Sequence, residues 1–296
     1  MQNTPPSIVA VGSLHYDIMV NADRQPEKGE TLMGSHWSPK FGGKGGNQAV
    51  AAHLTGSDVR FIGAIGYDDF GTFLRTHLEQ VGVNSDHLVI CNTAGSGMSV
   101  AIADADGDYA AVVVSGANAR LQPEDVSDAS LWAGGSVLIL QNEIPEEVNV
   151  AAAVAARAAG LKVVWNAAPM RPDNENLISL CDVVILNSVE ARQMTGKLVD
   201  NASDALIAAK TVADTGTATV VTIGGDGLAF CEIGGTAQHI PAIPVEKPQS
   251  HGAGDVFTGA LSTALASGVS LGIACERATR AAYLHVSGKK LELIAY

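Results

Sequence analysis

The sequence predicts an α/β fold in which helices cover both faces of a mainly parallel β-sheet. Short apolar runs rich in β-branched residues recur along the chain, and patterns rich in Ala and Leu at helical spacing lie between them. Apolar strands that alternate with helices are typical of a parallel sheet buried on both faces. The runs are SIVAVG (7–12), VRFIGAIG (59–66), SVLILQ (136–141), LKVVWN (161–166), DVVILN (182–187) and ATVVTIGG (218–225).

The helices expected between and after these strands include 146–159, 201–215 and an apolar helix over 256–266. Two regions break the alternation. Residues 16–40 mix polar and apolar residues with Pro26, Gly29 and Gly34, and residues 95–115 read as two strands around the turn DADGD. No linker, repeat or low-complexity tract occurs, so we expect one domain over 1–296 with these two segments as a small β lid.

Composition excludes several classes of protein. With 47% hydrophobic residues in 296, the chain can bury a large core. Its 31 acidic and 18 basic residues give a formal charge of −13, which disfavours nucleic acid and anionic membrane as partners. There is no leader pattern and no apolar run of about eighteen residues, so a cytoplasmic location is expected. The four dispersed cysteines are interpreted as reduced core thiols.

Polar residues gather just after the predicted strands, where ligands bind in open parallel sheets. These residues are His15 and Asp17, Asn142 and Glu143, Asn187 and Glu190, and Thr222 with Gly224 and Gly227. The pattern predicts a polar site at the carboxyl edge of the sheet.

The segment QSHGAGDVFTG (249–259) places small residues and one carboxylate at the start of a helix. Backbone N–H groups of Gly252, Ala253 and Gly254 could face an anion at the positive helix terminus, and a phosphate is the natural ligand. Asp255 could then take a proton from an attacking hydroxyl. The alternative is that Asp255 only stabilises the helix dipole, which is worth about 0.3–1 kcal/mol.

A second glycine-rich segment, FGGKGGNQAVAAH (41–53), also precedes an Ala-rich helix. It is not a P-loop, because Lys44 is followed by Gly45 and not by Ser or Thr. Either it forms a tight strand-to-helix turn, or its small residues let a polyol approach, with Lys44 and Asn47 forming hydrogen bonds. GVSLG (268–272) follows a helix and is not a nucleophile elbow, and His251 is interpreted as a spectator beside the glycine turn.

Taken together, these motifs resemble the ribokinase-like (PfkB-type) family of sugar and nucleoside kinases. The resemblance spans nearly the whole chain in order, and GGKGGNQ is closest to the ribokinase branch. The motifs are GSLHYD, FGGKGGNQAVAA, VSGANA (114–119), QNEIP (141–145), NSVEA (187–191), TIGGDG (222–227) and GAGDVFTGAL (252–261).

The resemblance implies a three-layer α/β/α sandwich whose β lid often also joins two protomers, and transfer of the γ-phosphoryl group of ATP to a hydroxymethyl group. It implies that Asp255 is the general base and that the turn formed by Gly252, Ala253, Gly254 and Asp255 stabilises the transferring phosphoryl.

The resemblance also implies the binding residues. His15 occupies the position before the lid where ribokinases typically carry Asn, and Asp17 would hold sugar hydroxyls. Gly43, Lys44 and Asn47 would line the same pocket, which Glu143 bounds. Asn187 and Glu190 would organise Mg²⁺ through water, and Thr222, Gly224 and Gly227 would approach ATP. For Glu190, the alternative is a solvated glutamate at a helix end.

Three features depart from the family pattern. Gln249-Ser250 replaces the usual Asp-Thr that helps bind a monovalent cation, and VSGKKLELIAY (286–296) lacks the Gly-Ala and Ser that complete that site. We therefore expect little activation by potassium. The third departure is His15 followed by the bulky Tyr16, which would enlarge the acceptor pocket.

Three hypotheses follow. The first is an ATP- and Mg²⁺-dependent kinase that acts on a ribose-like sugar, as a homodimer joined through the β lid. The second is a nucleoside kinase, including one for pseudouridine or a purine nucleoside, in which His15 and Tyr16 contact the acceptor. The third is a non-catalytic sugar- or nucleotide-binding regulator, which would have no need of the base at Asp255.

Overall fold

The structure is a computed structural model that describes residues 5–104, 109–171, 175–246, 248 and 251–291. Its main element is a nine-stranded sheet in the order β13-β12-β11-β10-β9-β8-β1-β4-β5. The seven strands from β11 to β5 run parallel, and β12 and β13 add an antiparallel edge. The strands are β1 (Ser7–Val11), β4 (Asp58–Gly66), β5 (Asn84–Cys91), β8 (Val137–Gln141), β9 (Lys162–Asn166), β10 (Val183–Asn187), β11 (Ala218–Thr222), β12 (Leu228–Cys231) and β13 (Gln238–Ile240).

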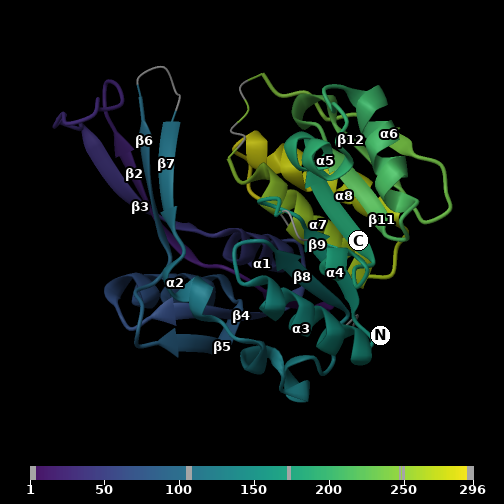
Figure 1. Ribbon diagram of the computed structural model, residues 1–296, viewed down its shortest axis with the longest axis horizontal. Helices are drawn as coiled ribbons and strands as arrows, with labels where there is room; N and C mark the ends of the chain where they lie inside the picture. Colours follow the sequence, from purple (N-terminus) through teal and green to yellow (C-terminus); the bar gives the residue numbers. More distant parts are fainter. Residues whose placement is uncertain (1–4, 105–108, 172–174, 247, 249–250, 292–296) are drawn as a thin grey trace.

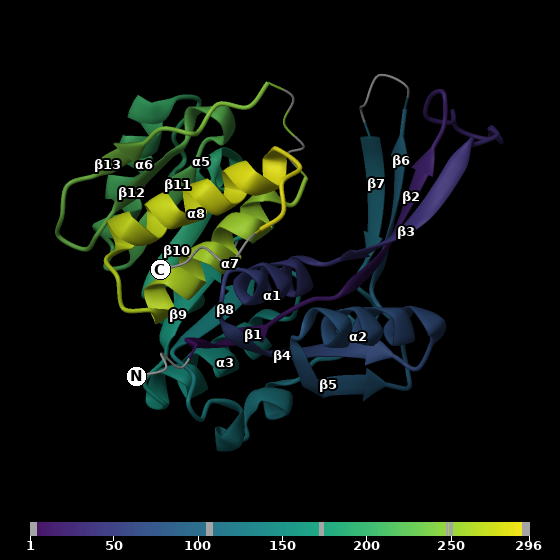
Figure 2. The same cartoon turned by 180° about the vertical axis from the view of Figure 1, so that it is seen from behind.

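Helices cover both faces of this sheet. One layer contains α3 (Glu146–Ala158), α4 (Glu175–Ile178), α5 (Ser188–Thr195) and α6 (Ala202–Ala213), and it faces the viewer in Figure 1. The other contains α1 (Lys44–Leu54), α2 (Asp69–Val81), α7 (Ala253–Ala266) and α8 (Leu271–Val286), as Figure 2 shows. Short 3₁₀ turns lie at Gly116–Arg120, Pro123–Val126, Ala129–Leu131 and Gly224–Asp226.

Each face of the sheet supplies its own apolar core. Alternate residues of β1 point to opposite faces: Val9 and Val11 belong to the core under α3, and Ile8 and Ala10 belong to the core under α1 and α7. All four are fully buried. The expected three-layer α/β/α sandwich with a mainly parallel sheet is confirmed.

A separate four-stranded sheet projects from one end of the molecule (Figure 1). Its order is β3-β2-β6-β7, and the hairpins β2–β3 and β6–β7 are joined by a parallel β2–β6 pairing. The strands are β2 (His15–Asn21), β3 (His36–Gly42), β6 (Met98–Ala103) and β7 (Tyr109–Val114). The expected small β-sheet is therefore present, while most of the predicted turn DADGD lies outside the described residues.

Helix α7 begins at Ala253, three residues before the predicted start at Val256. The apolar pattern marks only the buried part of a helix, and the first turn of α7 consists of small residues and Asp255. Gln249, Ser250 and the last five residues of the C-terminal segment lie outside the described residues.

Within the part of the chain that is described, no helix is long and apolar enough to cross a membrane. Three of the four cysteines are buried, and all four are free.

Candidate active site

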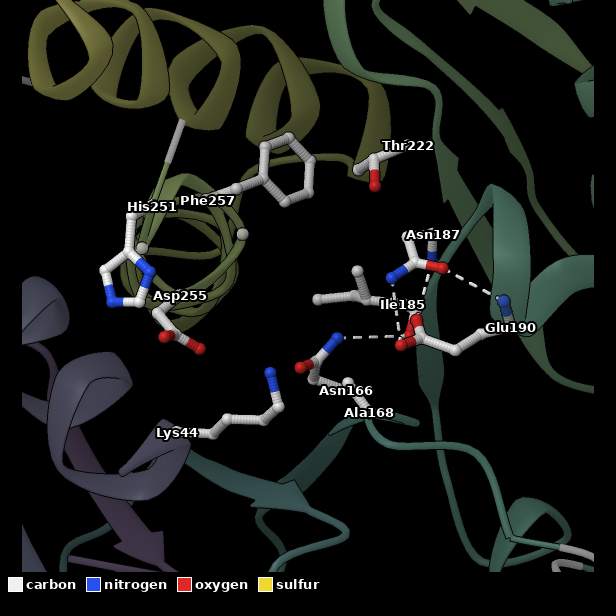
Figure 3. Close-up of a pocket in the computed structure, with 12 residues that line it drawn as sticks. Lys44, Asn166, Ala168, Ile185, Asn187, Glu190, Thr222, His251, Asp255 and Phe257 are labelled. Atoms are coloured by element: carbon white, nitrogen blue, oxygen red, sulfur yellow. Dashed lines mark hydrogen bonds between the residues drawn. The ribbon is translucent and has the colours of Figure 1, made fainter. Parts of the chain in front are cut away.

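The first turn of α7 borders a cavity of about 420 Å³ at the carboxyl ends of the central strands (Figure 3). Residues that end or follow β9, β10 and β11 form one side, and the starts of α1 and α7 form the other. The lining residues are Lys44, Asn166, Ala168, Ile185, Asn187, Glu190, Thr222, His251, Gly252, Gly254, Asp255 and Phe257. Seven predicted site residues from four distant segments therefore meet here.

Asp255 is the third residue of α7, and its carboxylate is held by two amides of α1. The amide of Gln48 donates to Oδ1 at 3.0 Å, and that of Asn47 donates to Oδ2 at 3.2 Å. The side chain is buried, and burial raises the pKa of Asp255, while Lys44 and the two amides oppose this shift. The carboxylate is thus a stronger base than an exposed aspartate and is fixed in orientation.

Gly252 occupies the N-cap position of α7, and within the described residues no side chain caps this helix. Gly252 precedes the helix with φ 81°, the left-handed conformation that glycine adopts at no steric cost. A Cβ added to Gly254 would meet no atom within 4 Å, so this glycine faces open space. The first turn can therefore present its N–H groups to an anion.

Asn187 and Glu190 form a capping box at the start of α5. The Glu190 carboxylate accepts from the backbone N–H of Asn187 at 2.8 Å and from its side-chain amide at 2.9 Å, and the Asn187 side chain accepts from the Glu190 N–H at 2.9 Å. Glu190 is only 6% exposed, and burial raises its pKa. The alternative of a solvated helix-end glutamate is wrong.

Asp17 lies at the base of the small sheet. Its Oδ1 accepts a hydrogen bond of 2.5 Å from Ser99 of β6, and burial raises the pKa of Asp17 against the opposing effects of Ser99, His15, His251 and Lys40. A Cβ on Gly42 would lie 1.9 Å from Oδ2 of Asp17, so a glycine is required beside this carboxylate.

Glu143 anchors the start of α1. Its Oε2 accepts from the backbone N–H of Lys44 at 2.8 Å and from Oγ of Ser13 at 2.5 Å, and Nδ1 of His15 lies 3.9 Å away. His15 is 4% exposed, and its buried Nε2 has no hydrogen-bond partner among the described residues. The structure places Glu143 and His15 beside the glycine-rich turn and not among the residues that line the cavity.

The glycines of GGKGG have packing roles. Gly43 has φ 88°, and a Cβ there would lie 2.8 Å from the backbone of Leu14 and His15. A Cβ on Gly45 would lie 2.5 Å from the backbone nitrogen of Ser13. These contacts let α1 start against the end of β1, which supports the tight-turn interpretation, and Lys44 extends from this turn into the cavity (Figure 3).

A second cavity of about 550 Å³ adjoins the first and shares Thr222, Gly254 and Phe257 with it. Most of its lining is apolar and comes from the segment after β13 and from α8. The remaining lining residues are Gly224, Gly225, Gly227, Leu228, Ala242, Ile243, Pro244, Val245, Pro248, Ala253, Thr279, Ala282, Tyr283 and Val286. A Cβ on Gly227 would lie 2.1 Å from the carbonyl oxygen of Ile240, whereas Gly224 faces open space.

Tyr16 packs against α2 and is not among the residues that line the two cavities. Its ring stacks on Phe70 with centroids 4.0 Å apart and contacts the edge of Phe73 at 4.9 Å, both on α2. Because successive strand residues point to opposite faces, His15 and Asp17 lie on one face of β2 and Tyr16 on the other.

Four contributing residues were missed from the sequence. Gln48 and Asn166 hold the Asp255 side of the cavity, since the Gln48 amide also donates to Asn166 at 3.2 Å. Asn166 ends a strand and could have been found by the strand-end rule. Ser99 and Gly42, which position Asp17, carry no local signal of this role.

The donor set fits Mg²⁺ held through water. Glu190 and Asp255 line the same cavity with Lys44, and no group of three or more His, Cys, Asp or Glu side chains that could hold a metal ion occurs in the described residues. Mg²⁺ keeps several waters and binds through one or two carboxylates and substrate phosphates. The cavity therefore suits a Mg²⁺–nucleotide complex better than an ion held by protein alone.

Comparisons with known proteins agree with this geometry. A family model described as pfkB family carbohydrate kinase matches residues 5–292. Ribokinase of Bacillus subtilis is 33% identical over 95% of this chain and 92% of its own length. Deoxyribokinase of Salmonella typhi is 28% identical over 95% and 93%. The structure of Arabidopsis thaliana ribokinase complexed with ribose and ATP superposes with a TM-score of 0.87 at 28% identity, covering 96% of this chain and 93% of that one.

Proposed function

We propose a substrate for this chain, which belongs to the pfkB family of carbohydrate kinases and is an ATP-dependent sugar kinase. The proposed substrate is a ribose-like sugar, and the proposed reaction phosphorylates its primary hydroxymethyl group. The observation that carries the proposal is the first turn of α7. There, an uncapped helix N-terminus and the buried carboxylate of Asp255 border one cavity. An anion site and a base at one place are what phosphoryl transfer to an alcohol requires.

In the proposed reaction, Asp255 accepts the proton of the acceptor hydroxyl as that oxygen attacks the γ-phosphoryl group. The amides of Asn47 and Gln48 hold the carboxylate in place. The N–H groups of the Gly252 to Asp255 turn, together with Lys44, stabilise the charge on the transferring phosphoryl. The reaction yields the sugar phosphate and ADP. Asp255 thus supports an enzyme over a non-catalytic regulator.

The second cavity is the proposed site of the nucleotide base. Its apolar lining suits a flat ring, and it shares Thr222 and Gly254 with the first cavity, so a nucleotide could extend from one to the other. Gly224 leaves space for the ligand, while Gly227 is needed by the fold itself. Asn187 and Glu190 would hold Mg²⁺ through water, and the ion would neutralise charge on the phosphates.

The acceptor is proposed to lie between Asp17 and Asp255. Asp17 would accept hydrogen bonds from the sugar hydroxyls, and Lys44, Asn47 and the backbone near Gly43 would form further hydrogen bonds with them. The packing of Tyr16 against Phe70 removes the aromatic contact that favoured a nucleoside, so a bare sugar is the better candidate.

A panel of acceptors tests this proposal. Purified protein with Mg²⁺ and ATP would be assayed for ADP release with ribose, 2-deoxyribose, hexoses and nucleosides. We expect the highest kcat/KM for a ribose-like sugar. A higher kcat/KM for any nucleoside would contradict the proposed acceptor while leaving the kinase chemistry intact.

We further propose that the chain is one domain whose small sheet closes over the acceptor and pairs with a second copy. Three consecutive valines of β7, Val112, Val113 and Val114, are 68%, 55% and 51% exposed, and Trp37 of β3 is 59% exposed. Such an apolar surface on a strand at the sheet edge favours association. Sedimentation equilibrium should give a dimer, and Val113→Asp should give a monomer. A wild-type monomer at micromolar concentration would contradict this proposal.

A further inference from the structure

His251 lines the cavity that contains Asp255, and it lies close enough to Asp17 for the two side chains to influence each other's pKa. It lines the cavity together with Asp255, and the two side chains approach the cavity from the same end of α7 (Figure 3). Its charge also acts on the pKa of Asp17 at the base of the small sheet. The imidazole remains accessible to solvent, so a ligand can reach it.

The backbone of His251 is fixed by a second histidine. Nε2 of His285, on α8, lies 2.8 Å from the carbonyl oxygen of His251. A carbonyl oxygen can only accept, so Nε2 of His285 carries the hydrogen and donates it. Gly252 follows in its left-handed conformation, which completes the turn. The imidazole of His251 is thus presented from an anchored position and not from a free loop.

The surroundings of His251 favour its neutral form. Burial lowers the pKa of His251, the charges of Lys40, Lys44 and His285 lower it further, and only Asp17 raises it. A neutral imidazole has one N–H donor and one acceptor nitrogen, which matches the two capacities of a sugar hydroxyl.

We propose that His251 is a specificity-determining residue that forms a hydrogen bond with a secondary hydroxyl of the acceptor, between the hydroxymethyl at Asp255 and the hydroxyls at Asp17. This assignment rests on the proposed function, and it replaces the interpretation of His251 as a spectator. His251, which precedes the glycine turn, then recognises the sugar, while the turn itself binds phosphate.

The test compares His251→Ala with wild type on ribose, 2-deoxyribose and 3-deoxyribose. We expect kcat/KM for ribose to fall about tenfold through a higher KM for the sugar, which is the size of one neutral hydrogen bond. The KM for ATP should stay within twofold. One of the two deoxy sugars lacks the recognised hydroxyl. For that sugar, His251→Ala and wild type should have the same kcat/KM. His251→Gln, which keeps a donor and an acceptor, should recover part of the loss.

A matched control is His87→Ala on the edge strand β5, which should leave all constants unchanged. Equal losses of His251→Ala on all three sugars would mean that the substitution loosens the turn and would overturn the assignment, as would an unchanged KM for ribose. If wild type prefers another sugar, the proposed acceptor is wrong. The same comparison with that sugar and its deoxy analogues then decides on His251.

Discussion

Two helix starts face each other across the cavity, and they use the same pattern in different ways. In α5 and in α7, the third helical residue is a buried acid, Glu190 or Asp255, whose pKa is raised by burial. Glu190 bonds to the backbone N–H and the side chain of its own helix cap. Asp255 bonds to two amides of α1, and the described part of the chain places Gly252, which has no side chain, at the cap of its own helix.

The difference distinguishes an acid that is engaged by its own helix cap from an acid that is held by another helix. The capping box at the start of α5 satisfies the backbone N–H groups of Asn187 and Glu190. The first turn of α7 is left open, and its acid is supported by another helix. A carboxylate that leaves its own helix terminus uncapped is thus the better candidate for catalysis, and five experiments test this contrast.

The largest effect is expected for Asp255→Asn. The variant should bind ATP and sugar as wild type does, because the amide has almost the same shape, but kcat should fall by about 10² to 10⁴, the contribution of a positioned general base. Initial rates and calorimetric binding would be measured on the same preparation. Turnover like that of wild type would remove Asp255 from the role of base.

Two glycine substitutions test two different properties of the α7 N-terminus. Gly254→Ala tests the open space beside it, and Gly252→Ala tests its left-handed backbone conformation. Gly254→Ala adds a methyl group where no atom lies within 4 Å, so its Tm should not change. Its kcat/KM for ATP should fall by about tenfold or more, because the methyl group would occupy space proposed for the phosphate and would hold it away from the N–H donors. Gly252→Ala should also lower Tm, because its φ of 81° costs a residue with a Cβ about 1–2 kcal/mol. Full activity in Gly254→Ala would show that phosphate does not lie against this turn.

Glu190 should show both a capping role and an ionic role. Glu190→Gln keeps the capping geometry and loses the charge, so Tm should be retained while the Mg²⁺ concentration for half-maximal rate rises, by about tenfold as for outer-shell partners of a metal. Glu190→Ala should in addition lose about 1 kcal/mol of stability, the typical value of a cap. An unchanged Mg²⁺ requirement in Glu190→Gln would mean that Glu190 only caps the helix and does not act on the ion.

A smaller effect is expected on the pH profile. Catalysis needs ionised Asp255, so kcat/KM should fall as pH drops through the pKa of Asp255, which burial raises above 3.8. Lys44 opposes this shift, so Lys44→Met should move the acid limb to higher pH. Lys162→Met, at the far end of β9, is the matched control and should not move it. An acid limb at lower pH in Lys44→Met would contradict the proposed pairing.

The sequence predicted most of the sheet, since buried parallel strands are continuous apolar runs. Five of the six predicted strands end within one residue of those observed, and 218–225 is too long because Gly224 starts a 3₁₀ turn. The missed strands β5, β12 and β13 lie at or near the sheet edges, where apolar character is weaker or the strands are short. Edge position is a tertiary property and leaves little local pattern.

The sequence identified those cavity-lining residues that belong to a local motif. Asp255 was identified because a small-residue turn and an acid start a helix. Gln48 was missed because its hydrogen bond to Asp255 joins residues 207 positions apart. The packing of Tyr16 on α2 was not predicted, because the sequence does not show which face of β2 lies toward α2.

The smallest effect is expected from exchanging Na⁺ for K⁺. In the described residues, the turn before α7 is supported by the hydrogen bond from His285 to the carbonyl of His251, which needs no ion. Gln249, unlike an aspartate, brings no charge to balance a monovalent cation. At fixed ionic strength, the rates in the two salts should agree within about twofold, because a site that lacks this carboxylate attracts a monovalent cation less strongly. A large rise in K⁺ would mean that an ion also supports the open terminus of α7. His285→Ala should then depend on K⁺ more strongly than wild type, because it would lack the protein's own support.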